Sequence, residues 1–220
     1  LPNLTLVTPC QWLADLLPDS FLRNVPVRVV YNGVDREQFR PRHSDIRTRY
    51  NIEAPYVALA VASEWESRKG YAYLAEIANR LSGKCQLVVI GLAQRQIEEM
   101  PKNVVALPRT ASLRELTQWY SAADCVINPT LEDNMPLVNL EALACGTPVA
   151  TFATGGCPEA INASCGAVVP KGDVDALAVA TLALCAQKHA MQAACLAQAE
   201  RFDAQTAAEA YHALYRELLA

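Results

Sequence analysis

One acidic residue stands out because it interrupts an almost wholly apolar segment. Glu141 lies in residues 137–144, LVNLEALA, on the same helical stripe as Leu137 and Ala144. A helix that is apolar nearly all round is expected to be buried. A buried carboxylate is costly unless something satisfies it. Glu141 is therefore either a structural residue bonded to a neighbouring backbone group or lysine, or a carboxylate that accepts hydroxyl groups of a ligand. The surrounding residues favour the ligand.

The start of this helix is a second candidate for chemistry. Pro136 suits a first helical turn. The free backbone N–H groups of Leu137 and Val138, with the helix dipole, attract a phosphate. Asp133 and Glu132 precede the same end. Glu132 is interpreted as ordinary charge complementarity at a helix N-terminus.

Two further segments carry suitable groups after predicted strands. Gly155 and Gly156 follow one strand, where paired glycines let a backbone approach a ligand closely, although such pairs are mostly turns. Arg68 and Lys69 follow another. Cations at that place hold a diphosphate, arginine in bidentate fashion, or they form a solvated surface pair. The residues alone leave both interpretations open.

Apolar runs that alternate with helical patterns position these groups. The predicted strands are residues 4–8, 27–30, 56–62, 86–90, 104–107, 125–128, 148–152 and 166–169. The predicted helices are residues 11–17, 71–81, 94–100, 113–123 and 137–144, and the chain from residue 173 is mostly helix, with Asp173 as an N-cap. Apolar strands alternating with helices indicate a parallel sheet covered on both faces. We predict a doubly wound, Rossmann-like α/β fold, with ligands at the carboxyl ends of its strands.

Composition narrows the function classes. The chain has 220 residues and a net charge of −4, so it lacks the basic footprint of a nucleic-acid binder. A 52% hydrophobic and 19% charged composition excludes disorder. Eight cysteines without a CxxC pair, beside three histidines, predict no zinc site but buried thiols of a reduced, cytoplasmic protein. No apolar run approaches the length of a membrane span, and the start at leucine indicates a piece of a longer polypeptide.

Five segments together carry a family resemblance. They occur in the order VVYNGVDREQF, RKG, YSAADCVINPT, EDNMPLVNLEALACGTPVA and TGGCPE. In this combination the chain resembles the C-terminal half of glycosyltransferase family 4, retaining enzymes of the GT-B fold, over nearly its whole length. The resemblance implies three units. Residues 1–25 end the preceding N-terminal half and its linker, residues 26–202 form the nucleotide-sugar-binding domain, and residues 203–220 form a helix that crosses back to the missing half.

The resemblance also assigns roles within a donor site. In the family a glutamate on the buried helix holds ribose hydroxyls, here Glu141. A carboxylate eight positions earlier faces the sugar, here Asp133, an aspartate in place of the usual glutamate. These two are the predicted catalytic residues. Lys69 matches the lysine that binds the diphosphate. The family's arginine six residues before that lysine is replaced by Ser63, and Arg68 is the candidate substitute.

The base of the nucleotide is expected beside residues 108–110. The resemblance implies that backbone groups make most of the contacts with the base. The predicted donor-binding residues are Lys69, Arg68, Ser63, Arg109, Asn134, Met135, Leu137, Val138, Gly155 and Gly156. No metal or other cofactor is expected.

The implied reaction transfers a sugar from a UDP- or GDP-sugar to an acceptor hydroxyl with retention of configuration. In having Ser63 and Asp133 at these two positions, the chain resembles a branch of the family that builds bacterial surface polysaccharides. The acceptor, a glycan or a lipid-linked group, would bind through the missing half, so this chain alone is expected to be inactive. The full-length protein is expected to be cytoplasmic, with peripheral association at the inner membrane face left open. Two alternatives remain: a non-catalytic nucleotide-binding module, favoured by Ser63 and Asp133, and a GT-B nucleotide-sugar epimerase, against which the full motif order counts.

Overall fold

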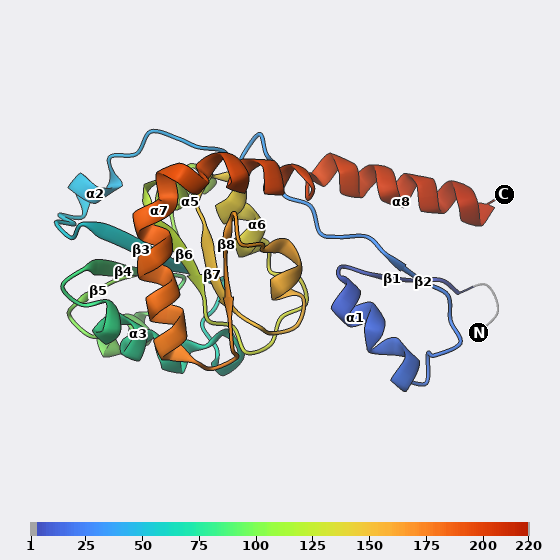
Figure 1. The fold of residues 1–220 in the computed structure, drawn as a ribbon, viewed down its shortest axis with the longest axis horizontal. Helices are drawn as coiled ribbons and strands as arrows, with labels where there is room; N and C mark the ends of the chain where they lie inside the picture. The colour runs from blue at the N-terminus through green and yellow to red at the C-terminus, as the bar shows by residue number, and fades with distance from the viewer. Residues whose placement is uncertain (1–3, 220) are drawn as a thin grey trace.

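A six-stranded parallel sheet forms the centre of the molecule. The computed structural model describes residues 4–219. The sheet has the order β5-β4-β3-β6-β7-β8 (Figure 1). Its strands are β3 (Tyr56–Val61), β4 (Cys85–Ile90), β5 (Val104–Leu107), β6 (Cys125–Asn128), β7 (Val149–Phe152) and β8 (Gly166–Val169). Residues 57–60 of β3 are fully buried, as expected for a strand covered on both faces. The predicted doubly wound α/β fold is confirmed.

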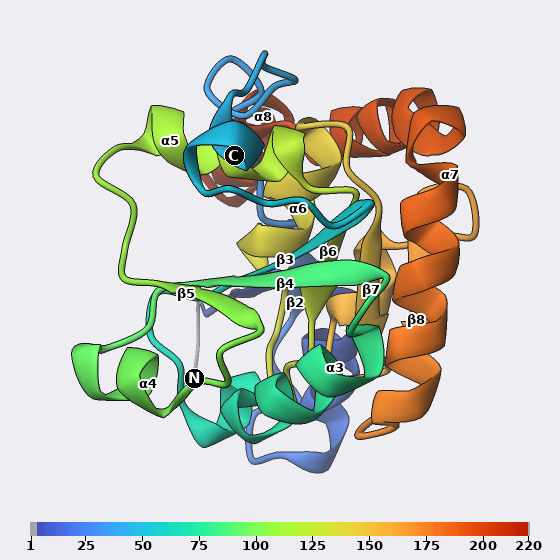
Figure 2. The same cartoon turned by 90° about the vertical axis from the view of Figure 1, so that its left-hand side faces the viewer.

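Helices cover the two faces of this sheet. They include α3 (Leu74–Leu81), α4 (Gln94–Glu99), α5 (Leu113–Ala122), α6 (Leu137–Ala144) and α7 (Val174–Glu200). The short helices α1 (Gln11–Asp15) and α2 (Ile46–Arg49) precede them in the chain, and α8 (Ala204–Leu219) extends away from the large sheet (Figure 1). Figure 2 shows α3 on one side of the sheet and α5 and α6 on the other, while α7 packs along β6 to β8. The predicted N-cap of α7 is confirmed, since the Asp173 carboxylate accepts a hydrogen bond from the Ala176 N–H at 2.8 Å.

The strand order reverses beside β3. The chain runs from β3 outward through β4 and β5, then returns to the other side of β3 and continues through β6, β7 and β8. All pairings are parallel, so β3 and β6 end at the same edge of the sheet. Because their crossover connections leave on opposite sides, a crevice opens beyond these two strand ends, the usual ligand position in such folds.

A second, small sheet stands apart from the first. Strands β1 (Leu6–Thr8) and β2 (Val27–Val29) pair in parallel, with Leu6 opposite Val27. Strand β2, which lies within the predicted nucleotide-sugar-binding unit of residues 26–202, pairs with β1 and not with the large sheet. The division at residues 25 and 202 stays a prediction, and residues 1–3 and 220 lie outside the described residues.

The long C-terminal helical region is two helices, because another segment crosses it. The Val34 N–H donates to the Phe202 carbonyl at 2.8 Å, and the Ala204 N–H donates to the Val34 carbonyl at 3.0 Å. A Cβ atom on Gly33 would lie 2.4 Å from the Ala204 Cα. The turn YNGVD therefore packs closely against the junction between α7 and α8.

The carboxylate of Glu159 helps to hold the small sheet unit against the large one. Glu159, in the 3₁₀ turn Cys157–Ala160, accepts hydrogen bonds from the backbone N–H groups of Gln11 and Trp12, both at 2.8 Å. These N–H groups begin α1, whose own N-cap residue Cys10 makes no side-chain cap. An anion at a helix N-terminus is favourable. Glu159 thus caps a helix 147 residues away in the sequence.

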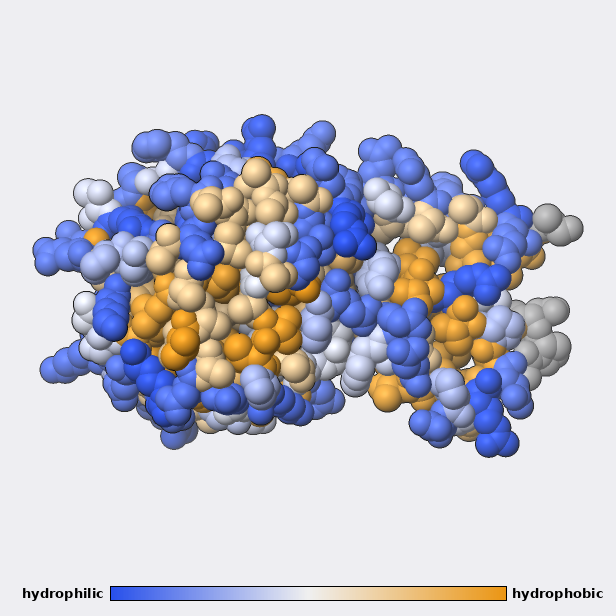
Figure 3. All heavy atoms as spheres, viewed as in Figure 1, coloured by the Kyte–Doolittle hydropathy of each residue, from blue (hydrophilic) through white to orange (hydrophobic). Residues whose placement is uncertain are grey.

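Apolar side chains remain exposed on two surfaces. One lies between α8 and the small sheet and the other over α7 and β8 (Figure 3). Tyr215 and Leu219 of α8 are 57% and 88% exposed, and Val179 of α7 is 70% exposed. All eight cysteines, by contrast, are buried and free, which confirms the predicted buried thiols. Among the described residues, no helix is both long and apolar enough to cross a membrane.

We expect Glu159→Gln to loosen the small sheet unit selectively. Glutamine has one acceptor oxygen, so one N–H of α1 loses its partner and the other loses a charged one. The loss of a charge-assisted bond, about 1.5–3 kcal/mol, predicts about 10- to 100-fold faster amide exchange in β1 and α1. Hydrogen–deuterium exchange of the two units measures this. The control Glu209→Gln changes a carboxylate on exposed α8, and equal exchange of β1 and α1 in both variants would refute the cap.

Candidate functional site

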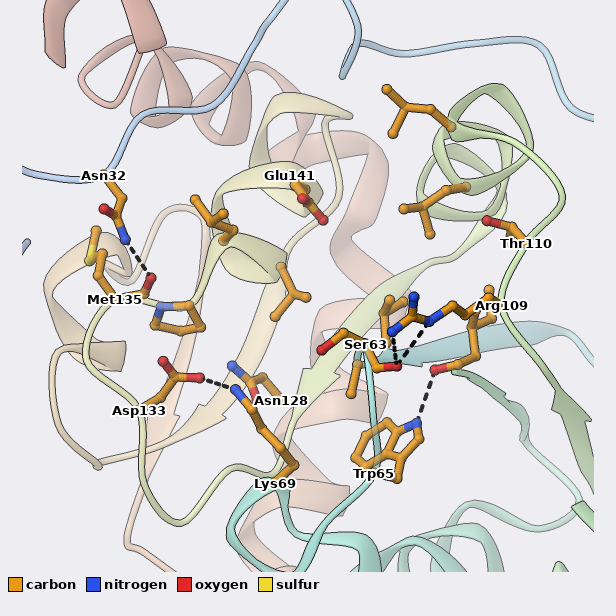
Figure 4. Close-up of a pocket in the computed structure, with 18 of the residues that line it drawn as sticks. Asn32, Ser63, Trp65, Lys69, Arg109, Thr110, Asn128, Asp133, Met135 and Glu141 are labelled. Carbon is orange, nitrogen blue, oxygen red and sulfur yellow. Dashed lines mark hydrogen bonds and ion pairs between the residues drawn. The ribbon is translucent and has the colours of Figure 1, made fainter. Parts of the chain in front are cut away.

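A pocket of about 660 Å³ opens at the reversal of strand order, beyond the ends of β3 and β6 (Figure 4). Eight predicted site residues line it: Ser63, Lys69, Arg109, Asp133, Met135, Leu137, Val138 and Glu141. Four predicted residues are not among its lining: Arg68, Asn134, Gly155 and Gly156. The chain therefore brings most of the predicted residues to one place, from segments more than 70 residues apart.

Lys69 and Asp133 form an ion pair on one side of the pocket. The Lys69 ammonium donates to Asp133 Oδ2. The two side chains are only 23% and 15% exposed. Because the pair is largely shielded from solvent, its attraction is stronger than that of a surface pair. The pair links the loop after β3 to the loop after β6.

Glu141 projects from α6 into the pocket and has one fixed oxygen. Its Oε2 accepts a hydrogen bond from the Tyr120 hydroxyl at 2.6 Å. Burial raises the pKa of Glu141, and the bond from Tyr120 opposes that shift only in part. Among the described residues, none donates to the second oxygen, Oε1. The partner is thus a phenol, not the backbone group or lysine considered from the sequence, and one oxygen remains available to a ligand.

The N-terminus of α6 faces the same pocket. Pro136 precedes the helix, and no side chain caps it. Among the described residues, none accepts a hydrogen bond from the N–H groups of Leu137 or Val138. Two unused donors and a helix dipole at a ligand site favour an anion.

Three amide groups hold α6 in this position. The Asn32 Nδ2 group donates to the Met135 carbonyl at 3.1 Å. The Asn128 Nδ2 group donates to Asn139 Oδ1 at 2.9 Å, inside the core. The first bond fastens the loop before the helix, and the second joins the helix to the end of β6.

The paired glycines, Gly155 and Gly156, pack against the backbone of the loop after β6 and do not line the pocket. A Cβ on Gly155 would lie 1.8 Å from the Asp133 carbonyl oxygen, and one on Gly156 would lie 1.9 Å from the Asn134 carbonyl oxygen. Gly155 also has a positive φ of 52°. The close contact therefore packs the turn after β7 beneath the loop that carries Asp133, and the observed role of the glycines is to position that loop.

The side chains of Arg68 and Arg109 point in different directions. The Arg68 side chain points away to Glu66, with Nε and Oε2 2.9 Å apart, while its backbone carbonyl accepts from the Leu131 N–H at 2.7 Å. The Arg109 Nε and Nη2 atoms donate to the Ser63 carbonyl at 3.2 and 3.1 Å (Figure 4). Arg109 therefore lies over the end of β3, whereas Arg68 does not reach the pocket.

Sequence reasoning missed several groups that shape the site. Asn32 and Tyr120 lie in the motif segments VVYNGVDREQF and YSAADCVINPT, in which neither residue was given a role of its own. Trp65 forms a wall of the pocket and is held by its indole N–H, which donates to the Ile90 carbonyl at 2.9 Å. A buried tyrosine hydroxyl needs a partner, so Tyr120 offered a usable signal; Asn32 and Trp65 offered little.

Comparisons with known proteins agree with this architecture. The profile of a family described as Glycosyl transferases group 1 matches residues 55–187. The D-inositol 3-phosphate glycosyltransferase of Saccharomonospora viridis is 30% identical, over 94% of this chain and 52% of its own length. The MMP alpha-(1->4)-mannosyltransferase of Mycolicibacterium hassiacum is 28% identical, over 80% of this chain and 44% of its own length. The chain thus spans about half the length of these relatives.

Solved structures match over almost the whole chain. Sucrose-phosphate synthase from Thermosynechococcus elongatus has a TM-score of 0.85 at 25% identity, covering 98% of this chain and 58% of that one. Anabaena Alr3699/HepE in complex with UDP-glucose has a TM-score of 0.77 at 21% identity, covering 94% of this chain and 63% of that one. The second likeness is one of fold alone.

We expect Gly156→Ala to destabilise the protein by steric contact. The φ of Gly156 is −85°, which any residue adopts, so only the contact with the Asn134 carbonyl and the Cys10 side chain opposes a Cβ. We expect a loss near 3 kcal/mol, the upper part of the overpacking range, in urea unfolding. In the control Gly83→Asn, a side chain enters open space at a φ that asparagine tolerates, at a cost below about 1 kcal/mol. Similar losses in both variants would contradict the packing role.

We expect Glu141→Gln to stabilise the free protein at neutral pH. Burial raises the pKa of Glu141 in the folded protein above its ordinary 4.5. At pH values between the unfolded-state and the folded-state pKa, the unfolded chain therefore binds fewer protons than the folded protein does. The free energy of unfolding therefore falls across this pH range and stays lower above it. Glutamine removes this loss, so we expect a higher Tm than that of the wild type at pH 7, by a few °C if the gain is on the order of 1 kcal/mol, as for a typical single substitution.

The difference in Tm should shrink as the pH falls below 4.5, where the carboxyl group is protonated in both states. The control Glu132→Gln changes an exposed neighbour outside the pocket. A lower Tm for Glu141→Gln at pH 7 would show that the carboxylate stabilises the fold.

Proposed function

This chain is a member of the Glycosyl transferases group 1 family, as its sequence motifs indicated, and we propose that it is the donor half of a retaining glycosyltransferase. In this proposal the pocket binds a nucleotide diphosphate sugar, and the whole protein transfers the sugar to an acceptor hydroxyl. Its relatives are named as glycosyltransferases, and neighbours of the same fold hold UDP or UDP-glucose. These names support a nucleotide sugar as the ligand class.

One observation carries the proposal: the pocket combines an available carboxylate oxygen with unused donors at a helix start. Glu141 Oε1 suits the hydroxyl groups of a ribose. The N–H groups of Leu137 and Val138, with Lys69, suit a diphosphate. A nucleoside diphosphate carries both groups in one molecule. A sugar phosphate without a nucleoside would leave the far, apolar part of the pocket beside Leu113 unfilled.

The proposed chemistry is electrostatic. When the bond from the sugar to the diphosphate breaks, the departing diphosphate gains negative charge. Donors fixed at the start of α6 and the ammonium of Lys69 stabilise that charge, and they need no reorganisation because the fold holds them. Asp133 faces the sugar in this proposal, and its pairing with Lys69 holds its carboxylate in one orientation. We propose no metal ion in the step, as expected from the sequence.

The acceptor would bind outside this chain. We propose a glycan or lipid-linked acceptor held by a further half of the protein, in synthesis of a bacterial surface polysaccharide or related glycoconjugate. The exposed apolar side chains of α8, such as Tyr215 and Leu219, support a helix that packs against that half. On this proposal the present chain alone transfers no sugar, and the whole protein acts in the cytoplasm.

The experiment is calorimetric titration of the chain with UDP, GDP and ADP, and then with their sugar conjugates. We expect one nucleotide to bind saturably and Glu141→Gln to weaken it about 10-fold, because a charge-assisted bond to the ribose becomes a neutral one. The control Glu132→Gln should bind as the wild type does. Binding that Glu141→Gln leaves unchanged would reject the ribose role.

Two other outcomes would favour the alternatives. A whole protein that binds nucleotide but transfers no sugar to any acceptor would be a non-catalytic binding module. Conversion of the nucleotide sugar without an acceptor would indicate an epimerase. Treatment with EDTA should leave transfer unchanged if no metal takes part.

A further inference from the structure

The pocket contains two cations, and they are compensated differently. Among its described lining residues, the cationic ones are Lys69 and Arg109, and the carboxylates are Asp133 and Glu141. Lys69 already pairs with Asp133. Arg109 is bound to a neutral acceptor, the Ser63 carbonyl, through Nε and Nη2. The positive charge of Arg109 is therefore the less neutralised of the two.

The nearest carboxylate does little to offset Arg109. Glu64 Oε1 lies 3.9 Å from Arg109 Nη2, and the two side chains are 76% and 70% exposed. Water screens such a pair, and its net attraction is small. The second candidate cation near this edge, Arg68, is turned to Glu66 and does not line the pocket. An anion that enters the pocket therefore meets Lys69 on one side and Arg109 on the other (Figure 4).

The two hydrogen bonds to the Ser63 carbonyl also orient the guanidinium group of Arg109. A guanidinium is planar, with donors at fixed angles, so two bonds from one edge to the Ser63 carbonyl set the direction of the rest. Among the described residues, Nη1 has no hydrogen-bond partner. The side chain is thus held above the end of β3 with a free donor edge, which reduces the entropy lost when it binds an oxyanion.

From this arrangement we infer that Arg109 is the second diphosphate-binding cation of the site, opposite Lys69, and that Arg68 has no part in binding. This inference rests on the proposed nucleotide-sugar function. The inference gives Arg109 a contact with the diphosphate, whereas the sequence analysis placed residues 108–110 beside the base. Ser63 contributes its backbone carbonyl as the anchor of the guanidinium.

The test compares a nucleoside diphosphate with its bare nucleoside. The probe pair is whichever of UDP, GDP or ADP the wild-type chain binds most tightly, together with the matching nucleoside. We expect Arg109→Ala to weaken the diphosphate about 10- to 100-fold, the loss of a charge-assisted contact, and the nucleoside by less than about twofold. Arg109→Lys keeps the charge without the planar fork and should lie between the two. Arg68→Ala is the matched control and should change neither affinity.

The outcomes separate the inference from the proposed function. If the wild-type chain binds none of the nucleotides, the proposed function fails and this inference fails with it. If it binds one and Arg109→Ala lowers the diphosphate and nucleoside affinities equally, Arg109 acts at the base and only the inference fails. A loss in Arg68→Ala as large as that in Arg109→Ala would also overturn it. Thermal unfolding of each variant without ligand excludes a folding defect as the cause.

Discussion

The reversal of strand order between β3 and β6 is the constraint on which the site depends. All six strands are parallel, so every polar residue that follows a strand collects at one edge of the sheet. Only at the reversal do the connections diverge, and there the edge stays open. The ends of β3 and β6 bring Ser63 and Asn128 to that opening, and α6 begins beside it with its N–H groups unused. The pocket thus follows from topology before any particular side chain is considered.

Packed loops then convert the open edge into a defined site. The glycine turn after β7 lies against the backbone of Asp133 and Asn134, at distances where no side chain fits. From the other side, the Arg68 carbonyl receives the N–H of Leu131. The loop of Asp133 is therefore held between two neighbours, and its carboxylate meets Lys69 without freedom to move away. Residues that never enter the pocket determine the geometry of those that do.

Sequence patterns predicted the elements well and the contacts between them poorly. Continuous apolar strands and helical stripes are local signals, and they located the large sheet, the start of α6 and the cap at Asp173. The short helix α2 has no apolar stripe, so its sequence IRTR carried no such signal. The contact of Gly33 with the junction between α7 and α8, and the pairing of β2 with β1, join distant parts of the chain, so no local pattern predicts them.

The same distinction applies within the site. Glu141 was identified because a carboxylate in an apolar helix violates a local rule. Its partner Tyr120 obeys the helical pattern and so drew no notice. Arg68 and Arg109 could not be ranked from the sequence, because each lies in the segment that follows a strand and side-chain direction is a tertiary property. Their neighbours, Glu66 and the Ser63 carbonyl, decide it.

Two charged side chains of the pocket, Glu141 and Arg109, are hydrogen-bonded to neutral groups. Glu141 is bonded to a neutral phenol and Arg109 to a neutral carbonyl, whereas an ionic partner would have neutralised either group. A neutral partner fixes the direction of a charged side chain but leaves most of its charge uncompensated, which costs stability in the free protein. Lys69 and Asp133 do the opposite and compensate each other. The site therefore holds one satisfied ion pair and two charges that remain available, and a ligand with both hydroxyl and anionic groups is the kind that would satisfy those two together.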